Sequence, residues 1–206
     1  MANPKKSHAK AVKHIGRYLL ATQEKGLILK PDPERSIDCY VDASFAGEWI
    51  KENADQAMSD PNTARSHTGF IIMFAGVPLT WSTKLQLTVA TSSTDAEIVA
   101  LSAATKETIF FFRLIDDANK LGNLHINLGK SKIHITVHED NQGTIELAKE
   151  YRIRPRTKHI NVKYWHFTQF MKTHPDIMSI KWVPSEEQLA DILTKPLSKL
   201  LHHKFI

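Results

Sequence analysis

The sequence lacks several features that would assign it to a well-known class of protein. It has one cysteine, Cys39, so a disulfide within the chain cannot form and a zinc site built from thiolates is not expected. No run of 18 or more apolar residues occurs, and the first thirty residues do not follow the pattern of a signal peptide. Internal repeats and low-complexity tracts are also missing. We therefore expect a soluble protein of a reducing compartment, without a membrane partner.

The composition fits one globular domain with a short appendage. The chain has 206 residues, of which 42% are hydrophobic and 24% charged, enough apolar side chains for a real core. Its formal net charge is +5, which favours a polyanionic partner. The basic residues form two groups: Lys5, Lys6, Lys10, Lys13, Arg17, Lys25 and Lys30, then Arg152, Arg154, Arg156, Lys158 and Lys163.

The first thirty-five residues are expected to be separate from the main domain. Apolar residues between His8 and Glu24 fall roughly on one helical face, and Gly26 ends that pattern. Pro31 and Pro33 mark a polar joint. The pattern predicts a basic helix and linker over residues 1–35, followed by a domain over residues 36–206.

The main domain alternates between strand and helix patterns. Strands are predicted at 37–41, 68–74, 77–82, 133–137 and 177–183, and helices at 93–120, 141–149, 157–173 and 186–194. Three consecutive strands indicate an antiparallel meander, and the later alternation indicates parallel pairing. The expected fold is α/β, a mixed five-stranded sheet flanked by helices on both faces.

Four acidic residues lie where such a fold could gather them. Asp42 and Asp140 each end a strand, Glu97 lies early in the long helix, and Asp191 lies in the last helix. A carboxylate at the end of a buried strand is costly unless it is exposed, hydrogen-bonded or bound to a cation. Each acid alone also has an ordinary explanation as a turn, cap or helix residue, and an aspartate that ends a strand more often has such a role. Together, the four could hold two Mg2+ ions, which prefer carboxylate oxygens and keep several waters.

Seven ordered blocks of sequence carry a family resemblance. They are VDASFAG (41–47), SHTGF (66–70), LTWSTKLQ (79–86), SSTDAEIVAL (92–101), EDNQ (139–142), RTKHI (156–160) and QLADILTKPL (188–197). This series closely resembles the ribonuclease H domain that ends the Pol polyprotein of copia-type LTR retrotransposons. Residues 8–31 are similar to the C-terminal tail of the reverse transcriptase that precedes it.

The resemblance implies a ribonuclease H-like fold and hydrolysis of the RNA strand of RNA–DNA hybrids by two-metal-ion catalysis. It gives Asp42, Glu97, Asp140 and Asp191 as the catalytic residues and ligands of two Mg2+ ions, with Mn2+ as a substitute. The implied partners are the hybrid and the reverse transcriptase of the same polyprotein. The implied location is the cytoplasm, within virus-like particles of the retroelement.

Six further residues are candidates for contacts with the hybrid. Hydroxyl and amide groups suit RNA 2′-hydroxyls, and basic groups suit backbone phosphates. The candidates are Ser93, Thr94, Asn141, Lys84, Arg156 and Lys158. Helix capping explains the first three equally well, and a solvated basic surface explains the others.

The sequence differs from cellular ribonucleases H at one place, a difference that the copia-type family generally shares, and from the copia-type family itself at two. The loop 183–188 has no histidine, whereas many cellular ribonucleases H have one there, and His138 is expected to be structural. Ser44 replaces an aspartate that is usual in the family. Asp95 stands where glutamate is commoner, and we expect it on the exposed face of its helix.

Two other functions fit parts of the pattern. The chain could be a catalytically weak or inactive hybrid-binding module that needs its reverse transcriptase partner. It could also be an integrase-type nuclease, which shares the fold. An integrase would not need Glu97 near the start of the first helix, so the block 92–97 argues against it.

Overall fold

The computed structural model describes residues 4–47, 60–122, 133–149 and 158–206. By its contacts the chain divides into two compact units, Met1–Lys30 and Pro31–Ile206. The first unit contains the helix α1 (Lys6–Ala21), none of whose residues is buried. Its apolar side chains Val12, Ile15 and Leu19 are all more than half exposed. Among the described residues, no helix is both long and apolar enough to cross a membrane.

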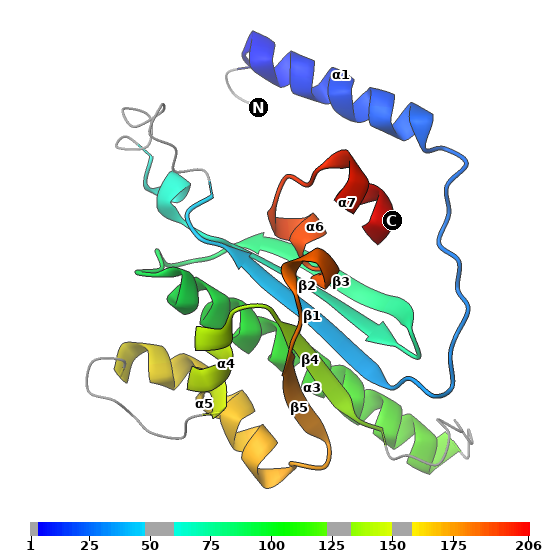
Figure 1. Ribbon diagram of the computed structural model, residues 1–206, viewed down its shortest axis with the longest axis vertical. Helices are drawn as coiled ribbons and strands as arrows, with labels where there is room; N and C mark the ends of the chain where they lie inside the picture. The colour runs from blue at the N-terminus through cyan, green and yellow to red at the C-terminus, as the bar shows by residue number, and fades with distance from the viewer. Residues whose placement is uncertain (1–3, 48–59, 123–132, 150–157) are drawn as a thin grey trace. The chain divides into compact units, whose positions relative to one another are not determined.

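The second unit contains five strands and several helices (Figure 1). The strands are β1 (Ile37–Ser44), β2 (His67–Phe74), β3 (Val77–Leu85), β4 (Ile135–Glu139) and β5 (Met178–Trp182). The longer helices are α3 (Ser93–Gly122), α4 (Gln142–Lys149) and α5 (Lys158–Thr173). The short ones are the 3-10 turns η2 (Pro61–Ala64) and η4 (Ser185–Glu187), with α6 (Asp191–Thr194) and α7 (Lys199–Phe205).

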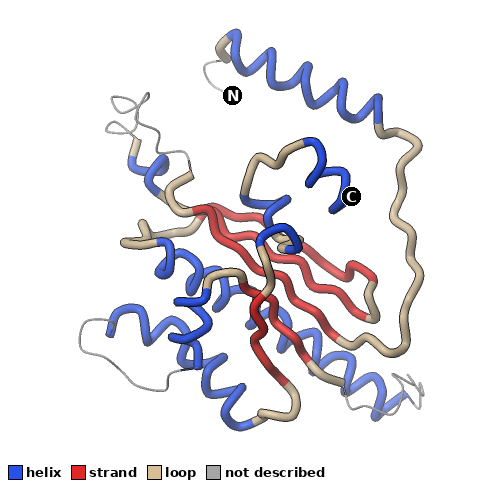
Figure 2. Tube along the Cα trace, viewed as in Figure 1, coloured by secondary structure: helices blue, strands red, loops and turns tan. Residues whose placement is uncertain are grey.

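The strands form one mixed sheet in the order β3-β2-β1-β4-β5 (Figure 2). β1 and β2 are antiparallel, as are β2 and β3, whereas β4 is parallel to both β1 and β5. The β2–β3 hairpin turns at Ala75 and Gly76, which both have positive φ, as two-residue hairpin turns require. The α/β fold with a mixed five-stranded sheet is confirmed.

The core lies between the sheet and α3. Alternation along β1 directs Ile37, Cys39 and Val41 toward the helices, and all three are buried. The buried face of α3 is rich in alanine, which lets the helix lie close to the sheet. On α5, Phe167 is buried in the same core, so α3, α4 and α5 form one layer.

The short helix α6 rests on the other face of the sheet. A Cβ at Gly69 of β2 would lie 2.5 Å from the Thr194 side chain and 2.9 Å from that of Leu193. Thr83 of β3 donates a hydrogen bond to the Leu193 carbonyl at 2.8 Å. Because Gly69 has no side chain, α6 approaches the backbone of the sheet directly.

The prediction of one helix over 186–194 is wrong. The chain forms η4, then leaves helical geometry at Gln188 before α6 begins. The fully buried Gln188 amide donates to the carbonyls of Val41 and His138, at 3.0 and 3.3 Å. Satisfying carbonyls of two strands fixes the backbone at Gln188, and a continuous helix does not form. The helix α7, which begins beyond Pro196 and is capped by Ser198, was not predicted.

Candidate active site

Asp42 is a fully buried carboxylate on the α6 side of the sheet. Regular alternation in β1 would leave it exposed, but α6 covers this position. The Thr194 hydroxyl donates to one of its oxygens, and the Lys195 ammonium lies 2.9 Å from the other. The site begins with a buried carboxylate that already has a hydroxyl and a cation as partners.

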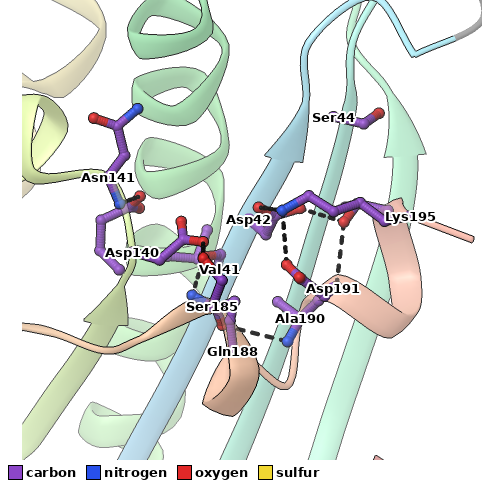
Figure 3. Close-up of polar contacts among 12 residues, drawn as sticks. Val41, Asp42, Ser44, Asp140, Asn141, Ser185, Gln188, Ala190, Asp191 and Lys195 are labelled. Atoms are coloured by element: carbon purple, nitrogen blue, oxygen red, sulfur yellow. Dashed lines mark hydrogen bonds and ion pairs between the residues drawn. The ribbon is translucent and has the colours of Figure 1, made fainter. Parts of the chain in front are cut away.

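Asp191 is the first residue of α6, one helical turn before Lys195. The Lys195 ammonium lies 2.9 Å from an Asp191 oxygen, so it bridges Asp42 and Asp191 (Figure 3). Burial raises the pKa of Asp191 to about 6, although the Lys195 ammonium opposes that rise. Burial would lower the pKa of Lys195, but the charge of Asp42 and the two hydrogen bonds raise it. Lys195 therefore stays charged between its two acids.

Asp140 follows β4 directly and is half-buried. The Ser185 hydroxyl donates to its carboxylate at 2.8 Å, and the Trp182 indole N–H donates to its carbonyl at 3.1 Å. Asp42, Asp140 and Asp191 each offer a carboxylate oxygen, and these oxygens all lie within 4.8 Å of one another. Three acids from β1, the end of β4 and α6 thus form a group that could hold a cation.

Glu97 belongs to a second group on the α3 side. Glu97, Glu139 and Asp140 also offer oxygens that lie within 4.8 Å of one another. Burial raises the pKa of Glu97, and the charges of Glu139 and Asp42 add to the rise. Burial also raises the pKa of Glu139, while a hydrogen bond from the Asn141 N–H opposes it. Without a cation, these buried carboxyl groups hold protons more tightly than usual.

The structure brings together all four acids selected from the sequence, in two groups that share Asp140. It adds Glu139, which sequence reasoning missed. A signal was present, because Ile135 and Val137 point into the core and Glu139 has the same parity in β4. An acid at an inward position of a buried strand calls for an explanation.

The candidate substrate contacts do not belong to either group of acids. Ser93 is exposed and Thr94 half-buried at the start of α3, and Lys84 is exposed on β3. Asn141 caps α4, because its side-chain oxygen accepts the Thr144 N–H at 3.1 Å. The side chain of Lys158 and the whole of Arg156 lie outside the described residues.

Asp95 is not on the exposed face of α3, contrary to expectation. It is 3% exposed, and its carboxylate accepts the Thr91 N–H at 3.0 Å. The carboxylate faces inward because it accepts a hydrogen bond from a backbone N–H of the turn that precedes α3.

Ser44, which replaces the aspartate usual in the family, lies at the end of β1. Its hydroxyl accepts the His67 N–H at 3.3 Å.

His138 has structural contacts, as its sequence position suggested. Its ring stacks on Tyr40 with 4.3 Å between centroids, and Nε2 lies 2.8 Å from Asp38.

In comparison with known proteins, the chain is similar to a segment of retroelement polyproteins. It is 33% identical over 196 residues to the retrovirus-related Pol polyprotein from transposon TNT 1-94 of Nicotiana tabacum. It is 30% identical over 205 residues to that from transposon RE1 of Arabidopsis thaliana. These alignments cover 95% and 100% of this chain but 13% and 12% of the polyproteins. No family model matches the chain.

The structure is also similar to that of LC11-RNase H1, isolated from compost by a metagenomic approach. The TM-score is 0.49 at 18% identity, and the alignment covers 77% of this chain and 92% of that one. Over nearly its whole length, the chain is thus a homologue of copia-type retrovirus-related Pol polyproteins.

Proposed function

We propose that this chain is an endonuclease that hydrolyses the RNA strand of RNA–DNA hybrids during retrotransposon reverse transcription. The observation that carries the proposal is the convergence of Asp42, Glu97, Asp140 and Asp191 from four separate elements. They form two overlapping groups at the ends of the parallel strands β1 and β4. Such a cluster suits the cleavage of a phosphodiester, and the relatives are Pol polyproteins.

The donor set fits divalent cations. All the offered atoms are carboxylate oxygens, the ligands that Mg2+ and Mn2+ prefer. One buried oxygen of Glu97 has no hydrogen-bond partner. Asp42, Glu97, Asp140 and Asp191 would hold two Mg2+ ions, for which Mn2+ can substitute. When bound, such ions supply a nucleophilic water at neutral pH and neutralise charge on the leaving oxygen.

Neighbouring residues keep these acids in place. Lys195 holds Asp42 and Asp191 together, and the Ser185 hydroxyl orients the Asp140 carboxylate. Gln188 joins the backbones of β1 and β4 near these acids, through the carbonyls of Val41 and His138. The chain thus positions the carboxylates through groups that do not react themselves.

The hybrid would be held by residues around the acids and by a neighbouring domain. Hydroxyls of Ser93 and Thr94 would meet RNA 2′-hydroxyls, and the Asn141 amide would touch the hybrid. Lys84, Arg156 and Lys158 would bind backbone phosphates. Residues 1–35 would be the tail of the reverse transcriptase, joined to a ribonuclease H domain over 36–206. The complex would act in the cytoplasm, within virus-like particles.

One assay tests the proposal. Labelled RNA–DNA hybrid is incubated with Mg2+ and either the wild-type chain or Asp140→Asn. Asp176→Asn, an exposed acid beside β5, serves as the control. We expect cleavage by wild type and Asp176→Asn only, with single-stranded RNA and RNA–RNA duplex left intact. Equal cleavage by wild type and Asp140→Asn, or none by wild type at high concentration, would overturn the proposal. Hybrid binding without cleavage would favour the inactive binding module.

A further inference from the structure

Glu139 is a buried acid in a position that normally takes an apolar side chain. It ends β4 on the same face as Ile135 and Val137, and it is 0% exposed. One carboxylate oxygen accepts the Asn141 N–H at 3.1 Å, while the other is buried without a hydrogen-bond partner. Leaving a buried polar atom unpaired costs free energy, so this second oxygen requires an explanation.

The neighbourhood of Glu139 adds negative charge instead of removing it. Glu97 is 6% exposed, and it too has a buried oxygen without a partner. Glu97, Glu139 and Asp140 offer oxygens within 4.8 Å of one another. Across the described ranges, no cationic side chain hydrogen-bonds to Glu97 or Glu139, because the Lys195 ammonium binds Asp42 and Asp191.

A purely structural role explains only half of the Glu139 carboxylate. Accepting the Asn141 N–H closes the turn between β4 and α4, but a glutamine oxygen could accept that bond equally well. A negative charge is not needed for it. The unpartnered oxygen belongs to a group of acids, where a cation or a proton would satisfy it.

We propose that Glu139 is a fifth carboxylate ligand of the metal centre, and that it binds the second ion together with Glu97 and Asp140. This inference rests on the proposed function, and extends the set of four acids there. Asp140 would join the two ions, since its carboxylate belongs to both groups. Three carboxylates on the second ion would bind it more tightly than two, because affinity rises with the number of charged ligands.

The test compares wild type with Glu139→Gln, which keeps the shape and the acceptor for Asn141 but removes the charge. Asp95→Asn is the matched control: Asp95 is another buried acid of this region with one unpartnered oxygen, and it belongs to neither group. Binding of Mn2+ alone is measured by electron paramagnetic resonance of the free ion. We expect two bound ions in wild type and Asp95→Asn. In Glu139→Gln, the affinity of one site should fall about 10- to 100-fold.

A second measurement separates ligation from a structural role. Glu139→Gln should unfold at the same or a higher temperature than wild type in EDTA, and Mg2+ should stabilise it less. Unchanged Mn2+ binding by Glu139→Gln would overturn the inference. So would a variant that is less stable in EDTA and gains as much from Mg2+ as wild type. Hybrid cleavage is measured in the same samples. A wild type that binds two ions without cleaving hybrid would remove the proposed function, and the Mn2+ data would still decide the role of Glu139.

Discussion

The two halves of the carboxylate cluster differ in the partners that their buried carboxylate oxygens have. On the α6 side, Asp42 and Asp191 share the Lys195 ammonium, and Asp42 also accepts from Thr194. On the α3 side, Glu97 and Glu139 each keep a buried oxygen without a partner. On the α6 side, protein groups alone therefore provide partners for the buried carboxylate oxygens. On the α3 side, these oxygens are all satisfied only when a cation or a proton is bound.

This difference predicts that the two halves depend on a bound metal ion to different degrees. Because the α6 half is held by ion pairs, its geometry exists before any metal binds. The α3 half pairs two acids that repel each other when both are charged, so it has most to gain from a divalent ion. Asp140 links the halves, and the loss of its charge should affect both.

Asp140→Asn should give the largest effect, because it removes the acid that the two groups share. We expect hybrid cleavage to fall on the order of a thousandfold, corresponding to several kcal/mol of lost stabilisation at the metal centre. Single-turnover cleavage with saturating Mg2+ measures it. A loss below tenfold would mean that the halves do not depend on Asp140.

Gly69→Ala should disturb only the α6 half. A Cβ would lie 2.5 Å from Thr194, so α6 must move and carry Asp191 with it. We expect a loss of about 1–3 kcal/mol in the free energy of unfolding, with weaker metal binding. Denaturant unfolding measures the first. In α1, Gly16→Ala has nothing within 4 Å of its Cβ and should leave metal binding unchanged. Equal stability of Gly69→Ala and wild type would show that α6 is not fixed by this contact.

Lys195→Met should make the α6 half resemble the α3 half. Without the ammonium, Asp42 keeps its Thr194 hydrogen bond but loses its cation, and the metal-free protein should lose about 2 kcal/mol. Mg2+ should restore much of that loss, since it replaces the missing charge. Thermal unfolding with EDTA and with Mg2+ tests this, and the exposed Lys199→Met serves as control. An equal loss in both conditions would contradict the comparison.

The smallest effect should come from pH. Burial raises the folded-state pKa of Asp191 to about 6, so the folded form binds a proton more tightly than the unfolded form. The resulting stabilisation is present below about pH 4 and is lost as pH rises through about 6. The raised pKa values of Glu97 and Glu139 act in the same direction. In EDTA, the melting temperature should fall by a few degrees from pH 5 to 8, and Mg2+ should suppress this trend. A melting temperature that rises with pH in EDTA would refute it.

Much of the fold could be predicted because it depends on local patterns. The hairpin at Ala75 and Gly76 and the long apolar face of α3 follow from short-range periodicity. The position of Asp140 directly after β4 also followed from the sequence, whereas Asp42 lies within β1, which runs on to Ser44 beyond its predicted end.

Other features depend on contacts between distant segments, which periodicity does not encode. Gln188 breaks a predicted helix because it satisfies carbonyls in β1 and β4, 147 and 50 residues away. Lys195 was not selected because its partner Asp42 lies 153 residues earlier. Glu139 was missed because the family motif gave a role only to its neighbour Asp140. Strand parity alone places Glu139 at an inward position of β4.

The docking of α6 has a consequence for the timing of synthesis. A growing polypeptide completes β1, with Asp42, long before it reaches the residues that pair with that acid. Until the segment 188–195 leaves the ribosome, Asp42 has neither its hydroxyl nor its ammonium partner, and β1 and β4 are not joined by Gln188. Contacts of such long sequence separation form slowly, because loop-closure entropy opposes them. A nascent or prematurely terminated chain that stops before α6 therefore has an incomplete acidic centre, and under the proposed function it would not cleave hybrid.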